Sequence, residues 1–170
     1  MRPRIYAACL AAYNNGILHG RWIDAAQSPD AIRADIAAML AASPIERAEE
    51  WAIHDYEGFE GAPLQEYSGV ETAHKLAAFV IEHGRLGGQV LAHFCGALDE
   101  AEAALENYAG EYPSLADFAQ ELTEDTGTQI PESLAPYIDY AAMGRDMDLS
   151  GDIFTITESF EAVHIFWTPR

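Results

Sequence analysis

The chain of 170 residues is 49% apolar and 11% aromatic, which excludes a disordered acidic tail because such a tail lacks the side chains that build a core. Its nine basic and 28 acidic residues give a formal net charge of −19, which excludes direct binding to nucleic acid, since such binding needs Lys and Arg to displace counterions. We therefore expect a folded protein whose natural partner is a basic surface on another protein.

Strand and helix signals alternate over the first sixty residues. Residues 4–13 predict a buried strand, and the Asn-Asn-Gly sequence at 14–16 predicts a hairpin turn, because Asn and Gly tolerate positive φ. Residues 17–24 predict the return strand. A helix is expected over residues 28–43, since this segment opens with a serine as N-cap and a proline at the first helical position. Residues 51–56 predict a third strand.

The middle of the chain changes to a helical pattern. Residues 58–69 are rich in Gly and Pro and predict a boundary between lobes. A helix is expected over residues 70–83, with Gly84 as its C-terminal cap. The Gly-Gly pair at 87–88 predicts a break before a short apolar helix over residues 89–95.

The C-terminal part combines helices with a hairpin. Helices are expected over residues 99–109 and 115–126, each followed by a glycine, and the second begins with a Ser-x-x-Asp capping sequence. A last helix, interrupted by a proline, is expected over residues 131–143. Residues 153–157 and 162–167 alternate like strands and predict a β-hairpin.

This segregation of strands and helices predicts an α+β fold. We expect an elongated chain of two to three small lobes. The N-terminal lobe, residues 1–60, would hold a small sheet with one helix, and the middle lobe, residues 61–103, would be helical. The C-terminal lobe, residues 104–170, would hold helices and a β-hairpin.

The sequence indicates a cytoplasmic protein. Its N-terminus lacks an apolar stretch followed by a cleavage site, and its apolar runs are too short to span a bilayer. Cys9 and Cys95 stand far apart and predict neither a disulfide framework nor a zinc site.

The negative charge is concentrated in the 59-residue window Leu86–Gly144, which contains eleven acidic residues and no Lys or Arg. Within the expected helix over residues 99–109, three of these acids share one face. Acids in a first helical turn are ordinarily favoured by the helix dipole, but this explains only part of the window. We predict that the window is a partner-binding surface, formed by Asp99, Glu100, Glu102, Glu106, Glu111, Asp117, Glu121, Glu124, Asp125, Glu132 and Asp139.

The opposite face of the same helix is apolar and must pack against the rest of the protein. We therefore expect Leu98–Leu115 to join lobes or subunits as well as to contribute carboxylates. Changing its acids should weaken binding gradually, whereas changing Leu105 or Tyr108 should damage the scaffold. The residues assigned to that scaffold are Leu98, Leu105, Tyr108, Gly110 and Tyr112.

No catalytic residue, metal ligand or cofactor is predicted. The six His residues lack a metal-binding spacing, and no phosphate loop or nucleophile motif is present. Residues 146–153 resemble the start of a calcium loop, with oxygen-bearing side chains at positions 1, 3 and 5 and Gly at 6. Position 12 is Thr157 instead of Glu, so a turn into the final hairpin is the alternative interpretation.

Four segments resemble ArdA-type antirestriction proteins, and they follow one another in the order found in that family. They are Ile5–Asp24, Glu50–Glu57, Leu98–Tyr112 and Ile138–Asp152. The third looks like the antirestriction motif of the family, with one departure, since the motif often has Cys where this chain has Ala109.

The resemblance implies an elongated, acidic homodimer that is carried on mobile genetic elements and mimics DNA. Such proteins occupy the DNA-binding groove of type I restriction-modification enzymes, on their methyltransferase core, and block restriction of incoming DNA. Because duplex DNA presents one charge per roughly 1.7 Å, two chains of −19 match a duplex on the order of 20 base pairs long. The alternative is an acidic interaction or chaperone-like module for another basic DNA-binding protein.

Overall fold

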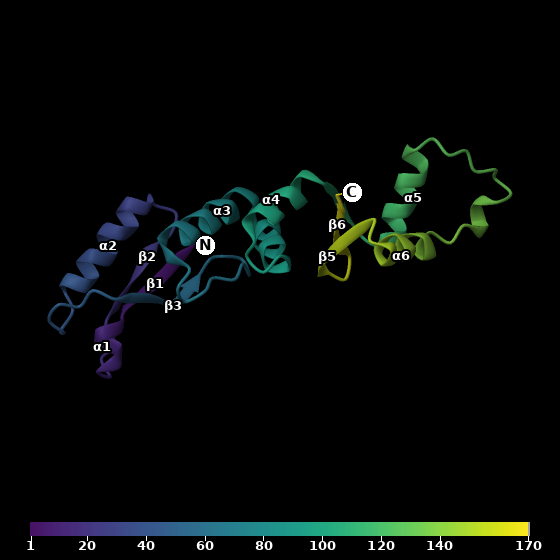
Figure 1. The fold of residues 1–170 in the computed structure, drawn as a ribbon. Helices are drawn as coiled ribbons and strands as arrows, with labels where there is room; N and C mark the ends of the chain where they lie inside the picture. The colour runs from purple at the N-terminus through teal and green to yellow at the C-terminus, as the bar shows by residue number, and fades with distance from the viewer. Residues whose placement is uncertain (170) are drawn as a thin grey trace. The chain divides into compact units, whose positions relative to one another are not determined.

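The computed structural model describes residues 1–169 and has two small antiparallel sheets, each accompanied by helices (Figure 1). The predicted α+β class is therefore confirmed. The chain divides into two compact units, which we call the first unit (residues 1–101) and the second unit (residues from 102 on). The division into three lobes stays a prediction.

The sheet of the first unit has β1 (Arg4–Cys9) at its centre, between β2 (Gly20–Asp24) and β3 (Trp51–Glu57). Both neighbours run antiparallel to β1, so that Ile5 lies opposite Ile23 of β2. These two side chains are buried, and their packing defines the core of this unit.

Helix α2 (Pro29–Ala41) lies beside this sheet, as Figure 1 shows, and contributes Ile32, Ile36 and Met39 to the core. Its predicted start is confirmed, because the Ser28 side chain accepts a hydrogen bond of 3.3 Å from the backbone N–H of Ala31.

The expected first strand is too long by four residues. The chain leaves the sheet after Cys9 and forms the short helix α1 (Leu10–Asn14). The turn at residues 14–16 is present, with Gly16 at a φ of 75°, but it closes this helix instead of a hairpin. The return strand is antiparallel as expected, although it begins only at Gly20.

The expected break at Gly87 and Gly88 is wrong. The interruption lies instead at Gly84, where the first helix was expected to end: helix α3 (Gly69–His93) is non-helical at this residue, with a φ of 60°, and is helical again through both glycines. Both are buried, and a Cβ on Gly88 would lie 2.3 Å from the carbonyl oxygen of Glu60. These glycines therefore permit close helix packing instead of ending the helix.

The sheet of the second unit has β6 (Ala162–Trp167) at its centre, between β4 (Tyr108–Tyr112) and β5 (Ile153–Ser159). The predicted C-terminal hairpin is confirmed by the antiparallel pairing of β5 with β6. On one face of the sheet lies an apolar cluster of Phe118, Ile153 and Ile165.

Strand β4 corrects the helix expected over residues 99–109. That helix, α4 (Leu98–Glu106), ends earlier. Tyr108 and Ala109 belong to β4, in which Tyr108 pairs with Phe166 of β6 and Ala109 lies at a shift in the register. Gly110 is a strand residue with a φ of 135° and not a helix cap. The free edge of β6 offers backbone hydrogen bonds, which outweigh the weak helical preference of this segment.

Helix α5 (Leu115–Asp125) is confirmed with its N-cap, since the Ser114 hydroxyl accepts a hydrogen bond of 3.2 Å from the backbone N–H of Asp117. The helix expected over residues 131–143 is wrong. Up to Asp139 only the short 3-10 turn η1 (Ala135–Tyr137) forms, and helix α6 (Tyr140–Ser150) overlaps the expected helix only over residues 140–143.

Helix α6 also excludes a calcium loop over residues 146–153. Asp146 and Asp148 lie within this helix, so they cannot form the irregular loop that an EF-hand requires. Gly151, at a φ of 77°, ends the helix and leads into β5. None of the helices among residues 1–169 is long and apolar enough to cross a membrane.

Candidate partner-binding surface

Helix α4 separates its carboxylates from its packing residues. Ala101 and Ala104 are buried, and Leu98 and Leu105 are half-buried. The polar side of the helix is exposed and consists of Asp99, Glu100, Glu102 and Glu106. The boundary between the two units falls within this helix, after Ala101.

Helix α5, like α4, has one buried apolar face and one exposed acidic face. Phe118 and Ala119 are buried, whereas four carboxylates face the solvent: Asp117, Glu121, Glu124 and Asp125. Asp117, Glu121 and Glu124 lie on one face at i, i+4 and i+7, with rises of about 6 and 4.5 Å along the axis. These intervals are wider than those of duplex phosphates, which follow one another every ~3.4 Å along each strand, but they likewise form a row of negative charges.

The remaining predicted surface residues lie on β4 and between the last two helices. Glu111 is on β4, Glu132 lies between α5 and α6, and Asp139 is the N-cap of α6. Together with the carboxylates of α4 and α5 they form a set that we call the eleven carboxylates, and all eleven are exposed. Their contact with a partner stays a prediction.

The first unit, by contrast, neutralises many of its acids with arginines. Arg2 lies 3.3 Å from Asp24, Arg21 lies 3.8 Å from Asp35, and Arg33 pairs with both Asp30 and Glu71. Arg4 pairs in the same way with Glu57. These pairs reduce the field of the first unit, although each contributes little to its stability because the side chains are exposed.

None of the eleven carboxylates forms an ion pair with another of the residues 1–169. The two units carry equal numbers of acids, fourteen each, but the first has seven basic residues and the second only two. The second unit therefore has a net charge of −12, against −7 for the first. This self-repulsion disfavours the compact state, and a basic partner would relieve it.

Some of the carboxylates also have local structural roles. Asp139 accepts a hydrogen bond of 2.9 Å from the backbone N–H of Ala142, and Glu121 accepts one of 3.2 Å from the Tyr112 hydroxyl. Burial, followed by this bond to Glu121, raises the pKa of Tyr112. Tyr112 therefore remains a protonated donor at neutral pH.

Tyr108 connects β4 to β6 through a partly buried chain of hydrogen bonds that the sequence did not reveal. Its hydroxyl lies 2.7 Å from Nδ1 of His164, and Nε2 of that ring lies 3.1 Å from a carboxylate oxygen of Glu158. His164 is only 4% exposed. With the ring protonated on Nε2, Tyr108 donates to Nδ1 and Nε2 donates to Glu158. The sequence signal was a lone His within the apolar strand Ala162–Trp167.

Burial, reinforced by the negative charges of Glu111 and Glu158, raises the pKa of Tyr108. The ring also packs on Phe166, with 5.0 Å between ring centroids. Of the predicted scaffold residues, Tyr108 thus has the strongest attachment, and Leu98, Leu105, Gly110 and Tyr112 are half-buried as well.

We expect Tyr108→Phe to reduce the free energy of unfolding of the second unit by about 1–3 kcal/mol, because the buried Nδ1 of His164 loses its donor. Urea denaturation would measure the loss. Tyr137→Phe is the matched control, since that ring is 83% exposed, and its change should be near zero. Equal stability of the two variants would contradict the role given to the Tyr108 hydroxyl.

The geometry offers no sign of a metal centre, since residues 1–169 contain no group of three or more His, Cys, Asp or Glu side chains placed to hold an ion. The family model described as "Antirestriction protein (ArdA)" matches residues 5–162. No curated protein matches the chain. The matched residues include all eleven carboxylates, whereas β6 lies beyond them except for its first residue, Ala162.

Proposed function

The chain belongs to the ArdA family of antirestriction proteins, and from this premise we propose that it acts as a mimic of DNA. In this proposal the protein occupies the DNA-binding groove of a type I restriction-modification enzyme, on its methyltransferase core, and so protects incoming unmodified DNA. It acts as a homodimer in the cytoplasm, where that enzyme meets DNA, and it needs no cofactor. The family is one of inhibitors, so the action is stoichiometric binding instead of catalysis.

The observation that carries the proposal is the exposure of the eleven carboxylates without an ion-pairing partner among residues 1–169. A groove that binds DNA holds Lys and Arg side chains to contact phosphates. Carboxylates on α4, β4 and α5 can meet the same side chains, while they lack a phosphodiester bond that a nuclease could cut.

Competition with DNA tests the proposal. The protein should displace a labelled duplex from a purified type I restriction-modification enzyme, and displacement should weaken steeply between about 50 and 200 mM salt, as DNA binding does. If the protein binds the enzyme without displacing the duplex at low salt, mimicry is wrong even though the protein remains an antirestriction protein.

Affinity capture from a lysate distinguishes the restriction-modification enzyme from the alternative partner, another basic DNA-binding protein. Small basic nucleoid proteins in the captured fraction would favour the alternative. A large assembly that contains a methyltransferase would favour the restriction-modification enzyme.

A further inference from the structure

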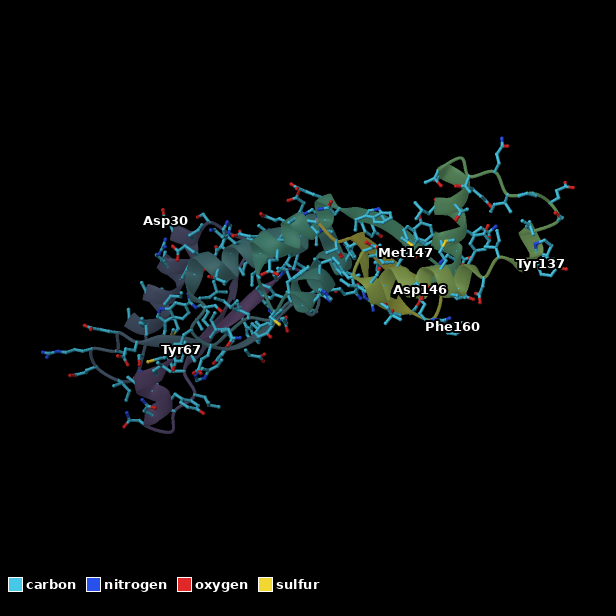
Figure 2. All side chains as sticks on the ribbon, turned by 45° about the vertical axis from the view of Figure 1, so that its right-hand side comes forward. Asp30, Tyr67, Tyr137, Asp146, Met147 and Phe160 are labelled. Carbon is cyan, nitrogen blue, oxygen red and sulfur yellow. The ribbon has the colours of Figure 1, made fainter. Side chains whose placement is uncertain are left out.

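The hairpin of β5 and β6 ends in a turn of two residues, Phe160 and Glu161, because Ser159 at the end of β5 pairs with Ala162 at the start of β6. The Phe160 side chain is 94% exposed, which is the highest value among the large apolar side chains of residues 1–169. Figure 2 shows this residue at the lower margin of the second unit. The hairpin therefore presents an aromatic ring to the solvent at its tip.

Phe160 differs from the other six phenylalanines, each of which packs against a second aromatic ring: Phe59, Phe79, Phe94, Phe118, Phe154 and Phe166. Within residues 1–169, Phe160 makes no such contact. Turn positions usually hold Gly, Pro, Asn, Asp or Ser, whose side chains suit the backbone of a turn. Neither the packing of this unit nor the turn itself therefore requires a phenylalanine here.

The strands behind the turn are held by side chains on both sides of the hairpin. Ile153 of β5 and Ile165 of β6 are buried in the cluster described above. Closer to the tip, Nε2 of His164 on β6 lies 3.1 Å from a carboxylate oxygen of Glu158 on β5. A ring on such a support loses little conformational freedom when a partner buries it, and this favours binding.

The charges beside the ring are negative. Glu158 and Glu161 flank Phe160 in the chain, and the hairpin Ile153–Trp167 contains these two acids and no Lys or Arg. A surface that covers the ring should therefore have cations around an apolar or aromatic centre. This arrangement resembles a nucleotide turned out of a duplex, whose unstacked base projects from a chain of phosphates.

Methyltransferases have a pocket with this chemistry. They turn the target base out of the duplex and hold it in a pocket, where it stacks between aromatic and apolar side chains. In the proposed function, the protein occupies the DNA-binding groove on such a methyltransferase core. Carboxylates replace the phosphates in that groove, but they supply nothing to fill the pocket for the base.

We propose that Phe160 is a surrogate for the displaced base, and that its ring enters the base-binding pocket of the methyltransferase while Glu161 meets cations at the rim. The inference rests on the proposed function and adds to it a contact that the eleven carboxylates do not provide. Burial of the ring contributes affinity that salt does not screen.

Displacement of a labelled duplex from the enzyme tests the inference. Phe160→Ser should weaken the affinity of the protein for the enzyme at least about tenfold, because an apolar ring is no longer buried. Phe160→Trp, which keeps an aromatic ring, should retain most of the affinity. Leu149→Ser is the matched control, since that side chain is 79% exposed on α6 beside Asp148, and its affinity should be unchanged.

Salt distinguishes burial of the ring from a contact between charges. The ratio of the dissociation constants of Phe160→Ser and the natural chain should stay the same between about 50 and 200 mM salt. The corresponding ratio for Glu161→Gln should approach one as salt rises, because this exposed carboxylate acts through its charge. A Phe160→Ser ratio that also approaches one would contradict burial of the ring.

Photochemical cross-linking tests where the ring lies. The photoreactive residue p-benzoylphenylalanine, placed at position 160, should label the same peptide of the methyltransferase as 5-iodouracil placed at the target base of a duplex. The same photoreactive residue at position 149 should not label that peptide. Labelling of a different peptide from position 160 would overturn the proposal.

A second copy of the chain is the other surface that could cover the ring, and sedimentation without the enzyme tests it. Phe160→Ser should sediment as the natural chain does, and dissociation of the copies by this change would assign the ring to a contact between them and overturn the proposal. If the natural chain displaces the duplex and Phe160→Ser displaces it equally well, only the base surrogate is wrong. Failure of the natural chain to displace the duplex would remove both the base surrogate and the proposed function.

Discussion

Affinity for a type I restriction-modification enzyme should fall roughly 70-fold when five exposed carboxylates of the second unit become amides: Glu102, Glu106, Glu111, Glu124 and Asp125. Each exposed charge pair contributes about 0.5 kcal/mol, so five changes remove about 2.5 kcal/mol. None of the five caps a helix, and amides have nearly the same shape, so the fold should be retained. Competition with a labelled duplex would measure the change.

A control variant with the same net charge is needed to test whether binding depends on the position of the charges or only on their sum. Five exposed acids of the first unit that form no ion pair among residues 1–169 serve as the control when changed to amides: Glu46, Glu49, Glu50, Asp55 and Glu82. Both variants move the net charge from −19 to −14. The variant with changes in the second unit should lose most of its affinity for the enzyme, whereas the control variant should lose only a small part.

Two outcomes of this comparison would change the interpretation. Equal losses would mean that binding depends on total charge and not on the second unit. Loss of all activity from one of the five changes alone, in a folded protein, would indicate a single specific contact and contradict a mimic whose charges act together.

The free energy of unfolding of the second unit should fall by about 3–5 kcal/mol on Phe118→Ala, because this side chain is 3% exposed at the centre of the cluster with Ile153 and Ile165. Its ring contacts those of Tyr112 and Trp167 at centroid distances of 5.2 and 5.6 Å. Removal of the ring leaves a cavity between α5 and the sheet. Inhibition should fail as well, since the carboxylates of α5 lose their support.

Hydrogen exchange would show whether the loss of stability is confined to the second unit. Amides of β4 and β6 should lose protection in the Phe118 variant, whereas amides of β1 should keep it, because β1 belongs to the first unit. Phe160→Ala is the control, since an exposed ring contributes little to stability. Unchanged protection in β6 would contradict the role given to Phe118.

Local signals in the sequence predicted the elements that depend on local interactions. The N-caps Ser28 and Ser114 identify the starts of α2 and α5, because a serine hydroxyl satisfies a free N–H of the first turn wherever the helix lies. Alternation of apolar residues likewise identified the hairpin of β5 and β6. Exposure of the acids followed from the cost of burying unpaired charge.

Two of the incorrect predictions involve contacts between residues far apart in the chain. Tyr108 and Ala109 continue a helical pattern, but the edge of β6, more than fifty residues away, draws them into a strand. Gly87 and Gly88 have the composition of a break, yet both are buried within α3, and the Glu60 backbone approaches Gly88 closely. Neither partner can be identified from the local pattern.

By itself, the sequence determined the α+β class, the acidic surface and the resemblance to an antirestriction family, because composition, capping and motif order are properties of short segments. Only the tertiary structure decided which side chains support that surface. The chain of hydrogen bonds from Tyr108 through His164 to Glu158 joins three strands, and the exposure of Leu134 and Tyr137 between α5 and α6 is likewise visible only in the folded chain. Burial and its absence are properties of the packed chain, and no local pattern contains them.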